Sequence, residues 1–132
     1  MARAQEPGLV FLDTHVVCWL YEGRSELLSA TAARAVESGD LFVSPVVDLE
    51  LQFLHEIGRI TKGAGPVLTT LSQELGLRMG EESFVRIVAK AREFTWTRDP
   101  FDRLMVAHAA LVRARLVSKD QTIRKYFPGA VW

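Results

Sequence analysis

Four acidic residues occupy positions from which their carboxylates could act together. These residues are Asp13, Glu50, Asp102 and Asp120. Asp13 directly follows the apolar run 9–12 and precedes a helical pattern, and Asp120 stands in the same relation to the run 116–118. In open parallel sheets the ligand site lies outside the carboxyl ends of the strands. We therefore expect Asp13 and Asp120 to lie at one edge of a sheet.

The aspartates also have a simple structural explanation as helix N-caps. Asp13 and Asp120 each precede a helical pattern, and such a cap is worth about 1 kcal/mol. Asp99 stands before Pro100, which suits a cap with proline at the first helical position, and Asp102 then falls in the first turn, where negative charge favours the helix dipole. Capping does not decide whether Asp102 points into a site or into water.

Glu50 is harder to explain by local structure. When residues 46–57 are placed on a helical wheel at about 100° per residue, Glu50 falls inside the apolar arc, between Ile57 and Leu54. A carboxylate that faces a core without a partner costs several kcal/mol. Its partner is either an arginine such as Arg103, in a buried ion pair, or a metal ion.

A cluster of four carboxylates needs positive charge. Two carboxylates about 4 Å apart repel by about 4 kcal/mol at an effective dielectric constant of about 20, so such a cluster persists only if it shares protons or binds cations. All-oxygen ligands favour Mg²⁺ or Mn²⁺, which lower the pKa of a bound water and offset charge on a phosphate. The predicted chemistry is phosphodiester hydrolysis, with Thr14 and Ser118 holding the acids or waters in place.

Basic residues in the second half of the chain are candidate contacts to a phosphate backbone. Residues 1–66 carry 5 Lys and Arg against 9 Asp and Glu, whereas residues 67–132 carry 11 against 7. The candidates are Arg98, Arg103, Lys119, Arg124 and Lys125. A solvated basic helix face explains the same asymmetry.

The apolar pattern predicts short strands that alternate with amphipathic helices. Strands are expected at 9–12, 41–43, 77–79, 116–118 and 130–132, and helices at 14–22, 30–37, 46–57, 67–75, 82–93, 101–114 and 121–126. The Gly-Ala-Gly-Pro stretch at 63–66 is expected to be a loop. The alternation is typical of βαβ units and predicts a single domain over 1–132, with a mostly parallel sheet and helices on both faces.

Composition favours a cytoplasmic protein with one core. Of the 132 residues 48% are apolar, which is enough to fold without metal or disulfide staples. Cys18 is the only cysteine, and we expect a buried thiol in a reducing compartment. The first residues, MARAQEPGLVFLD, lack the long apolar stretch of an export signal, and no apolar stretch reaches membrane-spanning length.

Four segments resemble the acidic blocks of PIN-domain ribonucleases: LVFLDTH, LFVSPVVDLELQ, TRDPFDRLMVAHA and LVSKDQTI. The length and the third segment are most similar to bacterial VapC-type toxins. By this resemblance the four catalytic, metal-binding acids of the family correspond to Asp13, Glu50, Asp102 and Asp120. Asp99 matches an additional acid of the third block. The sequence differs from many relatives at Leu49, where tryptophan is common, and at Ser118, where threonine is common, and neither change removes a proposed ligand.

The resemblance implies a three-layer α/β/α sandwich, an endoribonuclease that depends on Mg²⁺ or Mn²⁺, a homodimer, and neutralisation by a cognate antitoxin protein. Single-stranded or looped RNA is the expected substrate, because its phosphates and bases reach a shallow edge site. On this interpretation the apolar helix from Phe101 packs beneath the sheet and delivers Asp102 to a metal, while Arg103 braces an acid. Trp19, Tyr21 and Phe53 belong either to an antitoxin groove or to the core.

Two other functions stay open from the residues alone. The chain could be a non-catalytic PIN-like module that binds RNA or a protein, although such a domain would usually have lost one of the four acids. It could also be a phosphohydrolase with Asp13 as nucleophile, but enzymes of the haloacid-dehalogenase type need a second aspartate where His15 stands. His15 and His108 are expected to be structural, with a supporting role for His15 left open.

Overall fold

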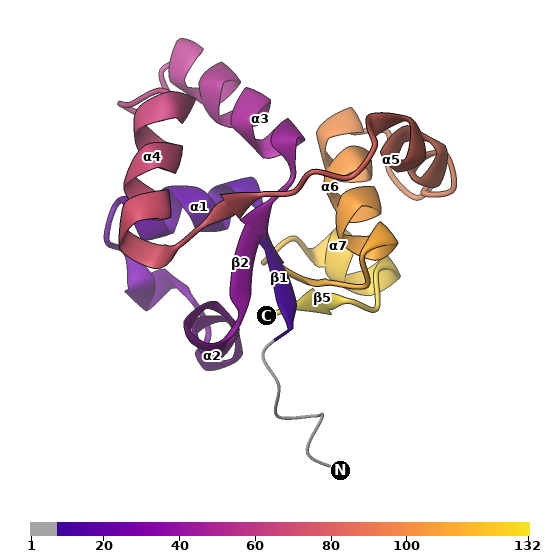
Figure 1. Ribbon diagram of the computed structural model, residues 1–132, viewed down its shortest axis with the longest axis horizontal. Helices are drawn as coiled ribbons and strands as arrows, with labels where there is room; N and C mark the ends of the chain where they lie inside the picture. The colour runs from indigo at the N-terminus through magenta and orange to yellow at the C-terminus, as the bar shows by residue number, and fades with distance from the viewer. Residues whose placement is uncertain (1–7) are drawn as a thin grey trace.

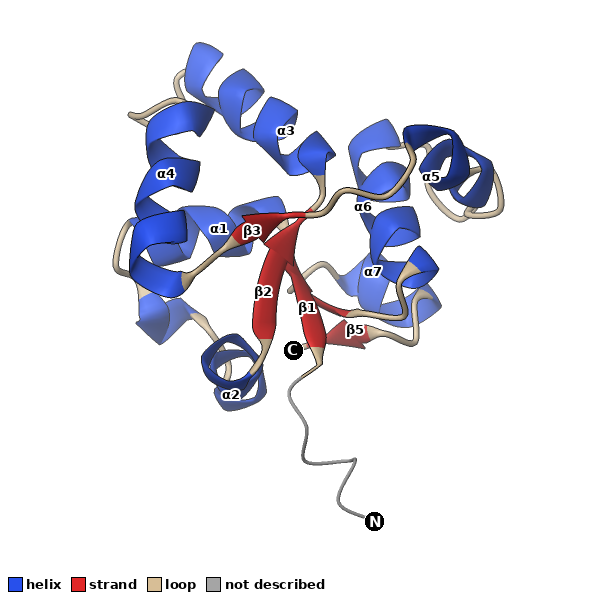
Figure 2. Ribbon diagram, viewed as in Figure 1, coloured by secondary structure: helices blue, strands red, loops and turns tan. Residues whose placement is uncertain are grey.

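The computed structural model describes residues 8–132, which form a five-stranded parallel sheet with helices on both faces (Figure 2). The strands are β1 (Leu9–Leu12), β2 (Asp40–Val43), β3 (Arg78–Met79), β4 (Arg115–Val117) and β5 (Ala130–Val131). The helices are α1 (Thr14–Tyr21), η2 (Ser25–Leu27), α2 (Ala30–Ser38), α3 (Pro45–Glu56), α4 (Ala64–Leu75), α5 (Phe84–Ala91), α6 (Pro100–Leu111) and α7 (Gln121–Tyr126). The predicted α/β sandwich is confirmed. The expectation about an export signal rests largely on residues 1–7, which lie outside the described residues.

β1 is the central strand of the sheet, whose order is β3-β2-β1-β4-β5. Val10 is paired with Leu41 of β2 on one side and with Arg115 of β4 on the other. The chain moves one way across the sheet as far as β3 and then crosses back to β4, so right-handed connections place α1, α2 and α4 on one face and α6 and α7 on the other. Figure 1 shows these two layers, with α3 rising from the end of β2. The crossing brings early and late segments together at the carboxyl ends of β1 and β4.

The core lies on both sides of β1. Val10, Phe11 and Leu12 are at most 1% exposed, which is why this strand reads as a continuous apolar run. On α6, every residue from 105 to 109 is buried, so the apolar helix packs beneath the sheet as predicted. Burial raises the pKa of the Cys18 thiol to about 11, so this half-buried cysteine stays protonated at neutral pH. None of the described helices is both long and apolar enough to cross a membrane.

Two predicted boundaries are wrong. The stretch 63–66 is not a loop: Gly63 caps α4, and Pro66 lies in its first turn, where a missing N–H is no loss. The helix expected to reach residue 114 ends at Leu111, because Arg113 adopts a left-handed conformation (φ 55°) that turns the chain into β4.

His108 joins three separate parts of the fold. Its ring is fully buried, with Nδ1 2.9 Å from Ser44 Oγ and Nε2 2.6 Å from Glu82 Oε1. Ser44 caps α3, Glu82 lies between β3 and α5, and His108 itself is on α6. Gly80 passes so close that a Cβ there would lie 2.6 Å from the ring. The histidine therefore fixes α3 against α6, the two helices that carry Glu50 and Asp102.

Replacing His108 should destabilise the protein more than replacing a peripheral histidine. His108→Ala leaves a cavity and leaves Ser44 and Glu82 without the ring that they contact. We therefore expect the free energy of unfolding to fall by about 2–4 kcal/mol. His55→Ala is the matched control on α3, where the half-buried ring makes one hydrogen bond, with the Ile60 carbonyl. Urea unfolding of both variants measures the difference, and equal losses would contradict a structural role specific to His108.

Candidate metal centre

Asp13 is held rigidly at the end of β1. Its backbone N–H donates to the Val117 carbonyl at 3.0 Å, which extends the pairing of β1 with β4. The residue is 5% exposed; Oδ1 accepts the Thr14 N–H at 2.7 Å and Oδ2 accepts the Ser118 hydroxyl at 2.6 Å. Both carboxylate oxygens are therefore oriented by hydrogen bonds from two neighbouring segments.

Asp120 is joined to Asp13 through Ser118. The Asp120 N–H donates to the Ser118 hydroxyl at 3.1 Å, and the same hydroxyl donates to Asp13. Asp120 Oδ1 accepts the Ile123 N–H at 2.9 Å, so the predicted N-cap of α7 is present. Capping engages one oxygen of this carboxylate.

Glu50 reaches the same edge from α3. Its Oε1 accepts the Thr14 hydroxyl at 2.5 Å, and Thr14 is buried directly after Asp13. Glu50 itself is only partly buried, because the buried side of α3 carries Val47 and Leu51 instead. The helical wheel placed Glu50 among apolar residues correctly, but three of those residues, Leu49, Phe53 and Ile57, are 62%, 48% and 52% exposed.

Arg103 does not brace an acid. Its guanidinium donates to the backbone carbonyls of Ala91 and Arg92, at 3.2 and 3.3 Å, and so ties α6 to the end of α5. The expectation that Arg103 supports a carboxylate is wrong, and so is its proposed ion pair with Glu50. Side-chain type and spacing could not reveal this, because the competing acceptors are backbone atoms freed at a helix end.

Asp99 and Asp102 complete the acidic edge from the start of α6. Asp99 Oδ1 accepts the N–H groups of Phe101 and Asp102, at 2.9 and 3.2 Å, which is the predicted N-cap. The pKa of Asp102 is raised to about 7, mainly by burial and then by the charges of Asp99, Asp13, Asp120 and Glu50, in that order. All the other acids therefore lie within electrostatic reach of Asp102.

The acids oppose one another's ionisation. Burial raises the pKa of Glu50, and the charges of Asp13 and Asp99 add to the rise. Burial likewise raises the pKa of Asp13, against the lowering effects of His15 and of the hydrogen bonds from Ser118 and Thr14. A cation held between the carboxylates would reverse these shifts.

The donor set fits a hard divalent cation. It offers carboxylate oxygens from several segments, which suits Mg²⁺ or Mn²⁺, and Mg²⁺ uses few carboxylates and keeps several waters. Within residues 8–132, however, no three acidic, His or Cys side chains already stand at the spacing of a complete metal site. The carboxylates share one edge, and an ion would have to draw them closer.

His15 is a neighbour of these acids that sequence reasoning left undecided. Its Nδ1 lies 3.4 Å from Asp13 Oδ2, and its Nε2 accepts the Lys119 N–H at 3.1 Å. A ring nitrogen that accepts carries no hydrogen, so the Nδ1 hydrogen faces Asp13. The position of His15 two residues after Asp13 was visible in the sequence, but its contact with Lys119 joins residues 104 positions apart and was not.

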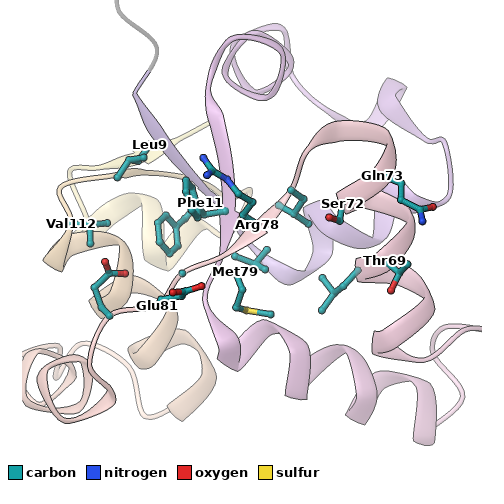
Figure 3. A pocket seen from close by; sticks show the side chains of 15 residues that line it. Leu9, Phe11, Thr69, Ser72, Gln73, Arg78, Met79, Glu81 and Val112 are labelled. Atoms are coloured by element: carbon teal, nitrogen blue, oxygen red, sulfur yellow. The ribbon is translucent and has the colours of Figure 1, made fainter.

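A cavity of about 820 Å³ lies elsewhere, over the sheet surface of β2 and β3 and beside α4 (Figure 3). Phe11, Phe42, Arg78 and Met79 line it, and none of the five acids does. This cavity and the acidic edge are therefore separate features of the surface.

Replacing one acid by a neutral isostere should stabilise the metal-free protein. The pKa of Asp102 rises from 3.8 to about 7 on folding, so the folded protein binds more protons in that window and stability falls as the pH rises through it. In EDTA at about pH 8, Asp102→Asn should melt a few degrees above wild type. Added Mn²⁺ should raise the melting temperature of wild type more than that of the variant.

Glu74→Gln, on the exposed surface of α4, is the control for this comparison and should leave both melting temperatures unchanged. Scanning calorimetry or a dye-based melt provides the measurement. An Asp102→Asn protein that melts below wild type without metal would show that the acids do not strain the fold.

Comparison with known proteins agrees with this architecture. A sequence profile of the PIN domain matches residues 10–127. The chain is 36% identical over 129 residues to "Ribonuclease VapC22" of Mycobacterium tuberculosis, covering 93% of this chain and 98% of that protein. Two solved structures share the fold. The Rickettsia felis VapBC2 complex bound to promoter DNA matches with a TM-score of 0.63 and 16% identity, over 92% of this chain and 95% of its own. A toxin–antitoxin complex from Klebsiella pneumoniae matches with a TM-score of 0.66 and 20% identity, over 93% and 96%.

The profile spans nearly the whole described chain, and the acids at its strand ends are those that the fold gathers at one edge. The chain belongs to the PIN-domain family.

Proposed function

We propose that this chain is a VapC-type endoribonuclease, acting as a single PIN-like domain over 1–132, that hydrolyses RNA phosphodiester bonds with Mg²⁺ or Mn²⁺ and serves as the toxin of a toxin–antitoxin pair. The observation that carries the proposal is the convergence of Asp13, Glu50, Asp102 and Asp120 at one carboxyl edge, where the pKa of Asp102 rises to about 7. The near-full-length similarity to a ribonuclease supports the choice of RNA.

The four acids would hold the metal, with Asp99 as an additional acid at the rim. When bound, the ion lowers the pKa of water and offsets the charge that grows on the phosphate. The hydrogen bonds from Ser118 to Asp13 and from Thr14 to Glu50 hold both carboxylates in place before a metal binds. No side-chain donor among residues 8–132 hydrogen-bonds the Asp102 carboxylate, which leaves it free to adjust.

Asp102 also makes metal binding sensitive to pH. With a pKa of about 7 in the absence of metal, the Asp102 carboxyl group is protonated in a fraction of the molecules at neutral pH. A cation must displace that proton before the oxygen can serve as a ligand. Affinity for Mn²⁺ is therefore expected to increase as the pH rises from about 6 to about 8.

Basic side chains beside the acids would bind the RNA backbone. Lys119 stands between Ser118 and Asp120, and Arg98 precedes Asp99. Such contacts supply affinity and orientation but do not read sequence. An open edge between loops accepts single-stranded or looped RNA, whose phosphates are not confined to a helix.

RNA cleavage by the purified protein tests the proposal. Wild type should cut single-stranded RNA with Mg²⁺ or Mn²⁺, lose activity in EDTA, and leave a 5′ phosphate and a 3′ hydroxyl. Asp13→Asn and Glu50→Gln should be nearly inactive, whereas Ser118→Ala should lose about 10- to 100-fold because it only orients ligands. Glu74→Gln on α4 is the control. RNA binding without metal-dependent cleavage would favour the non-catalytic module instead.

A protein interface is supported by apolar side chains that the fold leaves exposed. Leu49, Phe53 and Ile57 form one stripe along α3, and a second group on α5 comprises Phe84, Val85 and Val88. Contiguous exposed apolar surface of this kind marks interaction sites. We assign the α3 stripe to a homodimer contact. The similar structure from Klebsiella pneumoniae is a toxin–antitoxin complex, which supports an antitoxin as the second partner.

Light scattering of the purified protein tests the dimer. Phe53→Asp should convert a wild-type dimer into a monomer, because a charge at the centre of an apolar contact loses its hydration. Leu75→Asp, at a similarly exposed apolar position on α4, should leave the dimer intact. A Phe53→Asp protein that remains dimeric would remove the α3 stripe from the interface.

A further inference from the structure

An aromatic cluster lies directly beside the acidic edge. It consists of His15 and Trp19 on α1 and of Trp132, which follows β5. The rings of His15 and Trp19 are 5.0 Å apart between centroids and tilted by 59°, and those of Trp19 and Trp132 are 6.1 Å apart and tilted by 56°. Segments from opposite ends of the described chain thus bring three rings together.

The cluster is physically connected to the acids. His15 Nδ1 is 3.4 Å from Asp13 Oδ2, and its Nε2 accepts the N–H of Lys119, the residue between Ser118 and Asp120. The Lys119 ammonium in turn lies over the Trp19 ring, 6.0 Å from its centroid. The Asp13 carboxylate, the Lys119 ammonium and the three rings of the cluster therefore lie close together.

Core packing does not account for Trp19. All three rings of the cluster are only partly buried. Trp132 packs against the main hydrophobic core, but Trp19 is absent from the described side chains that do so. A tryptophan has a large apolar surface to bury. The Trp19 ring instead lies beside the His15 and Trp132 rings and the Lys119 ammonium. A flat ring, half exposed next to a cation, is a surface on which a nucleobase can stack.

We propose that His15, Trp19 and Trp132 form a stacking subsite for the unpaired base of a nucleotide adjacent to the scissile phosphate, with Lys119 contacting the phosphate between them. This inference rests on the proposed ribonuclease function. The position is suitable, because His15 Nδ1 lies 3.4 Å from an oxygen of Asp13, one of the acids proposed to hold the metal. A base inside a duplex has no free face to offer, so the subsite selects single-stranded RNA.

The subsite also predicts a mild base preference. Stacking on an aromatic ring is worth about 1–3 kcal/mol per base and accepts every base, because each has a π face. A purine covers more of the tryptophan ring than a pyrimidine does, so purines should bind more tightly. This preference requires no hydrogen bonds between the protein and the edge of the base.

Binding of a labelled single-stranded RNA in EDTA, followed by fluorescence anisotropy, tests the subsite without cleavage. Trp19→Leu should weaken binding by about 10-fold, as expected from the loss of one stacked base. Trp19→Phe, which keeps a ring, should remain within about 3-fold of wild type. The control is Phe42→Leu: Phe42 also has a cation over its ring, Arg78 at 4.7 Å, but it lines the cavity that contains none of the acids.

RNAs with one abasic position at a time distinguish stacking from a general loss of fold. At one position the missing base should weaken wild-type binding by about 10-fold and should not weaken Trp19→Leu further. The subsite would be overturned if, at every position, the affinity lost with the missing base and the affinity lost in Trp19→Leu were independent of each other. Equal losses of affinity in Trp19→Leu and Phe42→Leu would also overturn it. Thermal melts of the three variants identify any that are unfolded, and Trp19→Phe with the abasic series then carries the test.

The outcomes also separate this inference from the function on which it rests. Wild type that cleaves with metal while Trp19→Leu binds RNA normally would refute the subsite and leave the nuclease standing. Wild type that binds RNA with the expected abasic pattern but never cleaves would keep the subsite on a non-catalytic module. Wild type that binds no RNA in EDTA and cleaves none with metal would refute both.

Discussion

Repulsion between carboxylates is the constraint that shapes this edge of the molecule. Left to themselves, acidic side chains at a strand end turn towards water and away from one another. Here two hydroxyl groups hold them together: Ser118 donates to Asp13, and Thr14 donates to Glu50. These bonds fix the charged groups in place, and burial then makes their charges more costly. This edge of the folded protein therefore carries a local excess of negative charge that a cation would offset.

The order of the strands is what makes this arrangement available. β1 pairs with both β2 and β4, so the segments that follow these three strands leave the sheet at neighbouring points. Asp13 and Asp120 come from two of them, and Glu50 comes from the helix after the third. His108 then fixes α3 to α6 and so sets how far Glu50 stands from Asp102. Stability and chemistry depend here on the same contacts.

The acids could be predicted from the sequence because their positions are set locally. An aspartate between an apolar strand and a helix must lie at a strand end, and this placed Asp13 and Asp120 correctly. Arg103 was misplaced because a guanidinium chooses among acceptors that only tertiary structure supplies. The apolar side of α3 was recognised, but a helical wheel does not say whether a core or a partner covers Phe53. The contact between His15 and Lys119 joins residues 104 positions apart, after two neighbouring strands, and leaves no local pattern.

The bond between Ser118 and Asp13 joins residues 105 positions apart. During synthesis, a growing chain has made Asp13 and Glu50 long before the residue that orients the first of them exists. Until β4 has emerged from the ribosome and inserted beside β1, the acids cannot be gathered. A polypeptide interrupted before that point carries most of the acids but lacks both Ser118 and Asp120, so the acidic edge is completed last.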